Sequence, residues 1–231
     1  MSTTDEKTST SARSGGSRRF GPGPIIAIVA VVLVAGLLVL DRALSPAGDK
    51  VAVLGDSITF VTTGKIFEEF DDEYEVIGDA KLGARVQDMQ PTADSLASQQ
   101  PQQLIVDLGT NDVLLGTPID QAGAALRDMI GKFGSAECIH VVNINTRMTS
   151  DGAPVEDAAR AMNEQIEQIA AEDDRIDIID WDGMVAGSVD DEHPAGTFTA
   201  DTVHPSEEGQ RALADAMGDA LARCGRPWHI W

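Results

Sequence analysis

The sequence has little of what several classes of protein require. Its 231 residues include only two cysteines and one tyrosine, and four histidines that form no His/Cys cluster of the kind that binds zinc. No glycine-rich phosphate loop follows the first predicted strand. Basic residues are also scarce, since 17 Lys and Arg stand against 38 Asp and Glu, a net charge of -21. So acidic a chain repels phosphate backbones, which excludes nucleic acid as a partner.

The charge is unevenly distributed along the chain. Residues 1–46 carry five basic and three acidic side chains, a net of +2, so residues 47–231 hold 12 basic and 35 acidic ones, a net of -23. The chain is 42% hydrophobic, which is too apolar for an acidic disordered protein. Its length and composition indicate one folded domain with an N-terminal appendage.

The appendage has the pattern of a membrane anchor. Residues 1–19 are mostly Ser, Thr, Gly and charged residues and predict a disordered cytoplasmic tail. Residues 20–40 carry no charge and predict a transmembrane helix or signal anchor, followed by a linker at residues 41–49. Arg18 and Arg19 place the N-terminus in the cytoplasm, so we expect a single-pass protein of the cell membrane with an extracytoplasmic body. The alternative is a cleaved signal and a secreted protein.

The body, residues 50–231, alternates apolar runs with helical patterns. Five runs predict buried strands, at residues 50–54, 75–77, 104–108, 139–144 and 176–181. Helices are predicted at residues 62–70, 86–98, 119–132 and 155–171, and from Ser206, as an N-cap, to about residue 222. Continuous apolar strands separated by helices are typical of a parallel sheet covered on both faces. We therefore expect a single α/β domain with a five-stranded parallel sheet.

Polar clusters follow these strands at one edge of the predicted sheet, where the loops of α/β proteins carry function. Ser57 comes directly after the first strand and needs a base to act as a nucleophile. Among the histidines, only His204 both lies at this edge and follows a carboxylate by three residues. That carboxylate, Asp201, can orient its imidazole. The other three lie in a predicted strand, an acidic loop and the C-terminal tail: His140, His193 and His229.

Each of these residues also has a structural interpretation. Ser57 alone is more typical of an N-cap or a turn, and Asp-x-x-His alone can be a capping turn. Asn111 follows Gly-Thr after the third strand and suits a turn, although its side chain can also donate to an oxyanion.

The ordered motifs Gly-Asp-Ser, Gly, Gly-x-Asn-Asp and Asp-x-x-His resemble those of the SGNH (GDSL-type) hydrolase family, over a span from Gly55 to Pro205. The resemblance implies a flavodoxin-like three-layer sandwich and a serine esterase that needs no cofactor. It makes Ser57 the nucleophile, His204 the general base and Asp201 its orienting acid. The oxyanion hole would consist of the Ser57 N–H, a glycine N–H and the Asn111 side chain.

The match departs from the family pattern at two points. Ile58 stands where the motif has Leu, a conservative change. The glycine of the second motif has two candidates, and we favour Gly83 because it lies just before a predicted helix, where a backbone N–H is free. Gly78 is expected to end the second strand instead.

The two cysteines are expected to form a disulfide. Cys138 precedes the fourth strand and Cys224 follows the last helix, so both fall at the end of the domain opposite the site. A pair of cysteines outside the cytoplasm tends to be oxidised.

The leading hypothesis is an extracytoplasmic serine esterase acting on small acyl esters or on acylated envelope glycans. Only 4% of the residues are aromatic, which favours a short acyl group. Two alternatives remain open: an O-acyltransferase of envelope glycans that uses the same residues, and a non-catalytic domain that binds carbohydrate or protein. The membrane would be a partner through the N-terminal helix. Nothing in the sequence indicates an oligomer, so a monomer is the default.

Overall fold

A five-stranded parallel sheet forms the centre of the domain. The computed structural model of the chain describes residues 49–70 and 73–225. The strands are β1 (Lys50–Gly55), β2 (Glu75–Ala80), β3 (Gln103–Asp107), β4 (Cys138–Val142) and β7 (Ile176–Ile179). They lie in the order β2-β1-β3-β4-β7, and every neighbouring pair is parallel. The predicted sheet is confirmed in strand number, position along the chain and direction.

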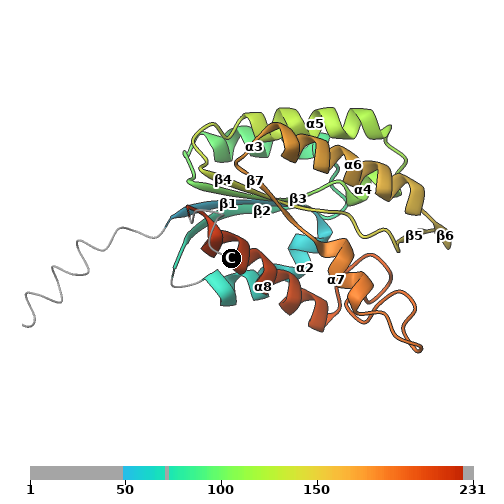
Figure 1. Cartoon of the computed structure of the whole chain (residues 1–231). Helices are drawn as coiled ribbons and strands as arrows, with labels where there is room; N and C mark the ends of the chain where they lie inside the picture. The colour runs from blue at the N-terminus through green and yellow to red at the C-terminus, as the bar shows by residue number, and fades with distance from the viewer. Residues whose placement is uncertain (1–48, 71–72, 226–231) are drawn as a thin grey trace, which may run out of the picture. The chain divides into compact units, whose positions relative to one another are not determined.

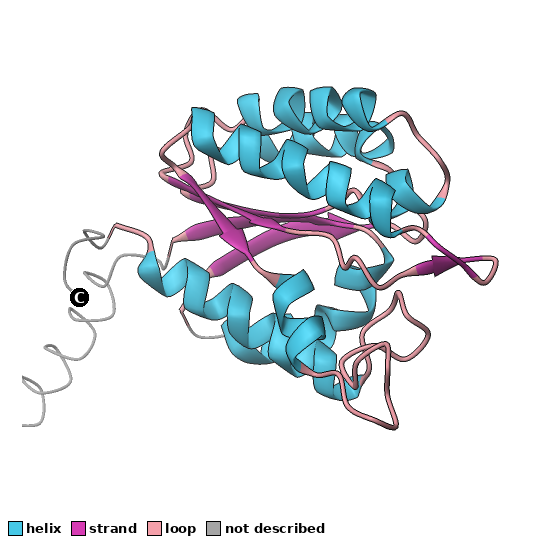
Figure 2. Ribbon diagram, turned by 45° about the vertical axis from the view of Figure 1, so that its right-hand side comes forward, coloured by secondary structure: helices cyan, strands magenta, loops and turns pink. Residues whose placement is uncertain are grey.

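Helices cover both faces of this sheet and complete a three-layer sandwich (Figures 1 and 2). One face carries α3 (Gln90–Ala97), α5 (Ile119–Gly131) and α6 (Glu156–Glu172). The other carries α2 (Ser57–Phe70), α7 (Trp181–Gly187) and α8 (Glu207–Arg223), with α2 packed against α8. The predicted fold class is therefore confirmed.

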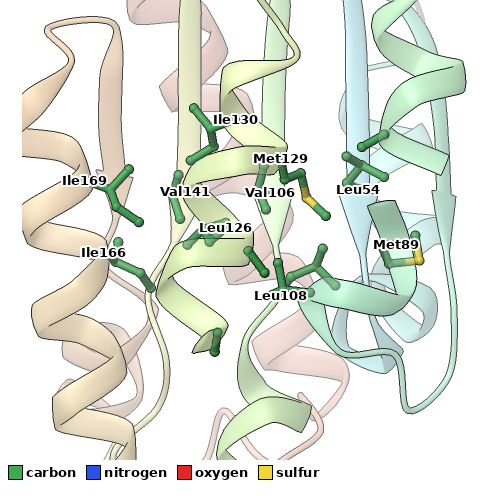
Figure 3. Close-up of a cluster of buried hydrophobic side chains, with 14 of the residues drawn as sticks. Leu54, Met89, Val106, Leu108, Leu126, Met129, Ile130, Val141, Ile166 and Ile169 are labelled. Atoms are coloured by element: carbon green, nitrogen blue, oxygen red, sulfur yellow. The ribbon is translucent and has the colours of Figure 1, made fainter. Parts of the chain in front are cut away.

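Alternate residues of the strands supply two separate cores. Val51, Val53 and Ile105 pack with α2 and α8, whereas the intervening Leu54 and Val106 pack with α3, α5 and α6. Figure 3 shows part of the second of these cores, where side chains of α5 and α6 lie over β3 and β4. Because both faces of the inner strands β1, β3 and β4 are buried, these strands appear in the sequence as nearly continuous apolar runs.

Helix α2 starts earlier than the sequence predicted, at residue 57 instead of 62. Asp56 explains the difference, because its Oδ1 accepts the Ile58 N–H at 2.8 Å and its carbonyl accepts the Phe60 N–H at 3.0 Å. Asp56 therefore satisfies N–H groups that the first turn of a helix leaves unpaired. The predicted N-cap of α8 is confirmed, with Ser206 Oγ accepting the Gly209 N–H at 3.1 Å.

Several short elements were not predicted. A 3₁₀ turn, η1 (Val86–Met89), precedes α3; α4 (Thr110–Leu114) follows β3; and β5 (Thr149–Ser150) pairs with β6 (Ala153–Pro154) in a small hairpin. The fifth strand was expected to reach residue 181 but ends at Ile179, because Asp180 caps α7 by accepting the Gly183 N–H. Gly78 was expected to end β2. It lies within the strand instead, opposite Val53 of β1.

The predicted tail, transmembrane helix and most of the linker, residues 1–48, lie outside the described part of the chain. Among the described residues, no helix is both long enough and apolar enough to cross a membrane.

The predicted disulfide is present. Cys138 begins β4 and Cys224 caps the C-terminal end of α8, and their Sγ atoms are bonded with the Cα atoms 5.8 Å apart. The bond joins residues 86 positions apart. It ties α8 to the sheet at the end opposite the carboxyl ends of the strands.

We predict that replacing both cysteines by alanine destabilises the domain without changing the site. Closing so long a segment restricts the unfolded chain, so the free energy of unfolding should fall by about 2–5 kcal/mol. Urea unfolding of the oxidised protein and of the Cys138→Ala/Cys224→Ala variant measures the difference. A reducing agent should lower the midpoint of the wild type and leave that of the variant unchanged. Equal midpoints for the two proteins would contradict a stabilising disulfide.

Candidate active site

The predicted site residues meet at the carboxyl edge of the sheet. Ser57 is the first residue of α2, directly after β1, and Gly83 lies in the turn after β2. Asn111 belongs to α4, after β3. Asp201 and His204 lie in the loop that leads into α8. Four separate connections thus contribute to one site, as the topology of a parallel sheet predicts.

Ser57, His204 and Asp201 form a continuous chain of hydrogen bonds. Ser57 Oγ lies 3.0 Å from His204 Nε2, and His204 Nδ1 lies 2.8 Å from Asp201 Oδ2. Ser57 is buried, with 6% of its surface exposed, whereas the His204 side chain is 40% exposed. The candidate nucleophile is thus largely shielded from solvent, whereas the imidazole beside it is accessible to solvent.

The local backbone wraps around the Asp201 carboxylate. Its Oδ1 accepts the N–H groups of Val203 and His204, at 3.1 and 2.7 Å. Partial burial acts to raise the pKa of Asp201, but the hydrogen bonds from the His204 imidazole and from the two backbone N–H groups outweigh it. They hold the pKa below its usual value, so the carboxyl is ionised.

This ionised carboxylate determines the imidazole tautomer. Because Asp201 can only accept hydrogen bonds, His204 Nδ1 must carry the proton of the bond between them. In the neutral ring Nε2 then has a free lone pair, directed at Ser57 Oγ. That is the arrangement a general base needs to take a proton from serine.

A second Asp-x-x-His pair in the same chain lacks a nucleophile. His193 Nδ1 lies 2.9 Å from Asp190 Oδ1, with both side chains about half exposed. Within the described residues, His193 Nε2 has no hydrogen-bond partner. The Asp–His contact therefore forms from local spacing alone. What distinguishes His204 is the serine on the far side of its ring.

Two backbone N–H groups in the connections after β1 and β2 are unpaired. Over the described ranges, neither Ser57 N nor Gly83 N donates a hydrogen bond to the protein. Gly83 has φ +72°, in the left-handed region where a side chain is strained, and a Cβ added there would meet no atom within 4 Å. Open space and free donors at this turn are the properties expected of an oxyanion hole.

Asn111, by contrast, uses both of its amide hydrogens. Its Nδ2 donates to Asp56 Oδ2 at 3.0 Å and to the Ala84 carbonyl at 3.1 Å. The side chain is thereby fixed between the loops after β1 and β2, and it is almost fully buried. To donate to a bound oxyanion, it would have to share or exchange one of these bonds.

Buried carboxyl groups lie at or just after the carboxyl ends of β1 and β3, and sequence reasoning assigned them no catalytic function. Asp107, at the end of β3, accepts a hydrogen bond from Thr59 Oγ1 at 2.7 Å, and burial raises its pKa to about 6. Burial, with repulsion from Asp107, raises the pKa of Asp56 well above its usual value, against the bonds from Ile58 and Asn111. Burial also raises the pKa of Asp112, which accepts the Val86 N–H at 2.9 Å.

No metal site accompanies these groups. In residues 49–70 and 73–225, no cluster of three or more His, Cys, Asp or Glu side chains could hold a metal ion.

Comparisons with known proteins agree with this geometry. Residues 53–212 match the model of the GDSL-like Lipase/Acylhydrolase family. No curated protein matches the chain. Among solved structures, the chain is similar to a member of the lipolytic protein G-D-S-L family from Veillonella parvula, with a TM-score of 0.62 and 22% identity over 75% of this chain and 98% of that one.

Two further structures are similar in fold. One is Axe2, an acetylxylan esterase from Geobacillus stearothermophilus, with a TM-score of 0.61 and 20% identity over 79% of this chain and 96% of that one. The other is the esterase EstA from Pseudoalteromonas sp., with a TM-score of 0.58 and 17% identity over 76% of this chain and 98% of that one.

We predict that Asp107 makes the stability of the domain fall as the pH rises. With a folded pKa of about 6 and an unfolded value of about 3.9, the folded state binds more protons between these limits. The contribution of Asp107 is therefore fully present below about pH 4 and lost as the pH rises through about 6.

The Asp107→Asn variant stays uncharged and keeps an acceptor for Thr59. Relative to wild type, its free energy of unfolding should rise by about 2–3 kcal/mol between pH 4 and 7, as measured by urea unfolding. Asp120→Asn, on the exposed side of α5, is the matched control. Parallel curves for wild type and Asp107→Asn would contradict the prediction.

Proposed function

Because the chain belongs to the GDSL-like lipase/acylhydrolase family and is a carboxylic ester hydrolase, we propose that Ser57, His204 and Asp201 are its catalytic triad. The observation that carries this proposal is the hydrogen-bonded chain from Ser57 Oγ through His204 to Asp201, with distances of 3.0 and 2.8 Å. It supports His204 Nε2 as the atom that takes the serine proton. The ionised Asp201 then stabilises the imidazolium that forms.

Acylation proceeds in two steps. Ser57 Oγ attacks the ester carbonyl carbon while its proton moves to His204 Nε2, and the carbonyl oxygen becomes the oxyanion of a tetrahedral intermediate. The intermediate collapses when the C–O bond to the alcohol breaks. The leaving oxygen takes the proton from Nε2, so the alcohol departs neutral and the acyl group remains on Ser57.

Deacylation repeats these steps with water. His204 Nε2 takes a proton from the attacking water, and a second tetrahedral intermediate forms. Its collapse breaks the bond to Ser57 Oγ, which recovers the proton from Nε2. A carboxylic acid is released and the triad returns to its starting state.

The oxyanion is stabilised by the N–H groups of Ser57 and Gly83 and by Asn111. The two backbone groups are unpaired and can donate at once. Asn111 must exchange one of its two hydrogen bonds. In this proposal it releases the Ala84 carbonyl and keeps the bond to Asp56, which connects its amide to the loop after β1. Donors arranged before the reaction lower the free energy of the charged intermediate.

We propose short acyl esters as substrates, either small molecules or acylated envelope glycans. The low aromatic content supports a short acyl group, and the similarity of fold to an acetylxylan esterase is consistent with a carbohydrate ester. The proposed location is outside the cytoplasm, anchored by residues 20–40. An O-acyltransferase would differ only in replacing water by a glycan hydroxyl in deacylation, and assays of acetyl release with and without a glycan acceptor distinguish the two.

We predict that Ser57→Ala and His204→Ala each abolish most of the activity. By analogy with other serine triads, kcat should fall by about 10⁴–10⁶. Initial rates on p-nitrophenyl acetate measure the loss, and a fluorophosphonate probe should label the wild type but not Ser57→Ala.

The matched control is His193→Ala, which removes the other Asp-x-x-His imidazole and should leave kcat within about twofold. Near wild-type turnover by purified, folded Ser57→Ala would refute the proposal. So would equal losses for the two histidine variants, because they would point to a general effect of histidine removal.

For Asn111→Ala we predict a loss in kcat of about 10²-fold, near the lower end of the range for oxyanion donors, because the wild-type side chain has to exchange a bond. KM should change by less than about threefold. Steady-state rates on the same ester, with the thermal midpoint as a check of folding, provide the measurement. A large rise in KM at constant kcat would instead place Asn111 in ground-state binding.

A further inference from the structure

The residue that follows Asp201 has an unfavourable backbone conformation. Thr202 has φ +72°, in the left-handed region. Of the described residues other than glycine, only Gln100 and Asp151 share this sign of φ, and both lie in exposed turns and are not β-branched. The left-handed region is a genuine outlier for a β-branched residue and persists only where the surroundings enforce it. Thr202 lies between the two residues whose contact orients the imidazole.

Three hydrogen bonds hold Thr202 in this conformation. Asn145 Nδ2 donates to the Thr202 carbonyl at 2.9 Å, and the Thr149 N–H donates to Thr202 Oγ1 at 3.1 Å. The Thr149 and Thr202 hydroxyls are also 3.1 Å apart. Both partners come from the segment after β4, more than 50 residues away along the chain. We call these three residues, Asn145, Thr149 and Thr202, the clamp.

The segment that carries Asn145 is itself held in place by hydrogen bonds. Asn145 is 2% exposed, and its Oδ1 accepts the Arg147 N–H at 2.9 Å. On one side, the Thr146 N–H and hydroxyl both donate to Asp182 Oδ1 of α7, at 2.7 and 2.8 Å.

On the other side, Asn163 of α6 makes two bonds to the backbone of Ile144, at 2.7 and 2.8 Å. The segment therefore has fixed contacts with helices on both faces of the sheet.

The clamp holds the turn that carries Asp201 and His204. Asp201 Oδ1 accepts the N–H groups of Val203 and His204 while Oδ2 faces the His204 ring. Asp190 accepts the N–H groups of Glu192 and His193 in the same way without a left-handed residue, so local spacing is enough to close such a turn. The clamp instead fixes where the turn lies. If Thr202 were released, it would relax toward the β or right-handed region, and the turn would move relative to Ser57.

We propose that Asn145 and Thr149 are positioning residues, which act through Thr202 to keep the turn of Asp201 and His204 aligned with Ser57. This inference rests on the proposed catalytic roles of Asp201 and His204. Neither clamp partner contacts the Ser57–His204–Asp201 chain directly. Their effect is on the geometry of the turn, where displacement of a reacting group by about 1 Å can reduce turnover by about 10²-fold.

The test compares Thr202→Val with Thr202→Ser. Valine has the shape of threonine and keeps the backbone strain but cannot accept the Thr149 N–H, whereas serine keeps the hydroxyl. Thr202→Val should lower kcat on p-nitrophenyl acetate about tenfold with KM within about twofold, and Thr202→Ser should restore most of the rate. Asn145→Ala, which frees the Thr202 carbonyl, should lower kcat similarly.

The control is Ser135→Ala, which removes a hydroxyl bond to the Pro101 carbonyl at the opposite end of the sheet and should leave kcat unchanged. Rates are measured well below the thermal midpoint of each variant, so the folded enzyme is compared in every case. Thr149 and Thr202 also line a cavity of about 410 Å³. If they bound substrate there, Thr202→Val would raise KM instead of lowering kcat, and the proposal would be overturned.

Wild-type kcat in both Thr202→Val and Asn145→Ala would also overturn it, as would a loss in Thr202→Ser equal to that in Thr202→Val. Ser57→Ala separates this failure from that of the proposed function. If Ser57→Ala is inactive while the clamp variants are fully active, only the clamp is wrong. If Ser57→Ala retains near wild-type activity, the proposed triad is wrong and the clamp has no catalytic turn to position.

Discussion

The contact between Ser57 Oγ and His204 Nε2 joins residues 147 positions apart, and the proposed chemistry depends on keeping these atoms 3.0 Å from each other. Ser57 is placed by the junction of β1 and α2, and His204 by the loop that begins α8. Because α2 and α8 pack against each other on the same face of the sheet, the two junctions are fixed by one helix–helix interface. The disulfide holds the other end of α8 to β4. The serine–histidine distance therefore depends on the packing of the core as well as on contacts within the site.

The carboxyl groups around the site fall into two sets, whose pKa values are shifted in opposite directions. Asp201 receives three hydrogen bonds, which hold its pKa below the usual value and keep its charge beside the imidazole. Asp56 and Asp107 are buried at or just after the carboxyl ends of β1 and β3, where desolvation and mutual repulsion raise the pKa of Asp56, and burial that of Asp107. Two ionised carboxylates there would oppose the negative charge of an oxyanion. The raised pKa values mean that ionisation of both groups at once is disfavoured in this buried position.

Patterns in the sequence predicted the features that depend on local order. Apolar runs alternating with helical periods gave the five strands, and the Ser206 cap marked the start of α8. The topology of a parallel sheet placed Ser57, Asn111, Asp201 and His204 at one edge, where the structure also has them. Distant contacts that belong to no motif could not be predicted, because pairs such as Thr59 with Asp107, or Asn145 with Thr202, leave no periodic signal. The pair Asp190 and His193 illustrates this limit: its spacing forms the same Asp–His contact, and only the tertiary structure shows that no serine faces it.

The donors of the proposed oxyanion hole differ in what they gain from the intermediate. The N–H groups of Ser57 and Gly83 have no protein partner, so a developing oxyanion gives each a bond to a charged acceptor that it lacked. Asn111 already donates twice, so its gain is only the difference between an oxyanion and the Ala84 carbonyl. Charge-assisted bonds are stronger than neutral ones, so this difference remains favourable. In the proposed mechanism the backbone donors would therefore supply the larger share of stabilisation, and Asn111, which joins the loops after β1, β2 and β3, the smaller share.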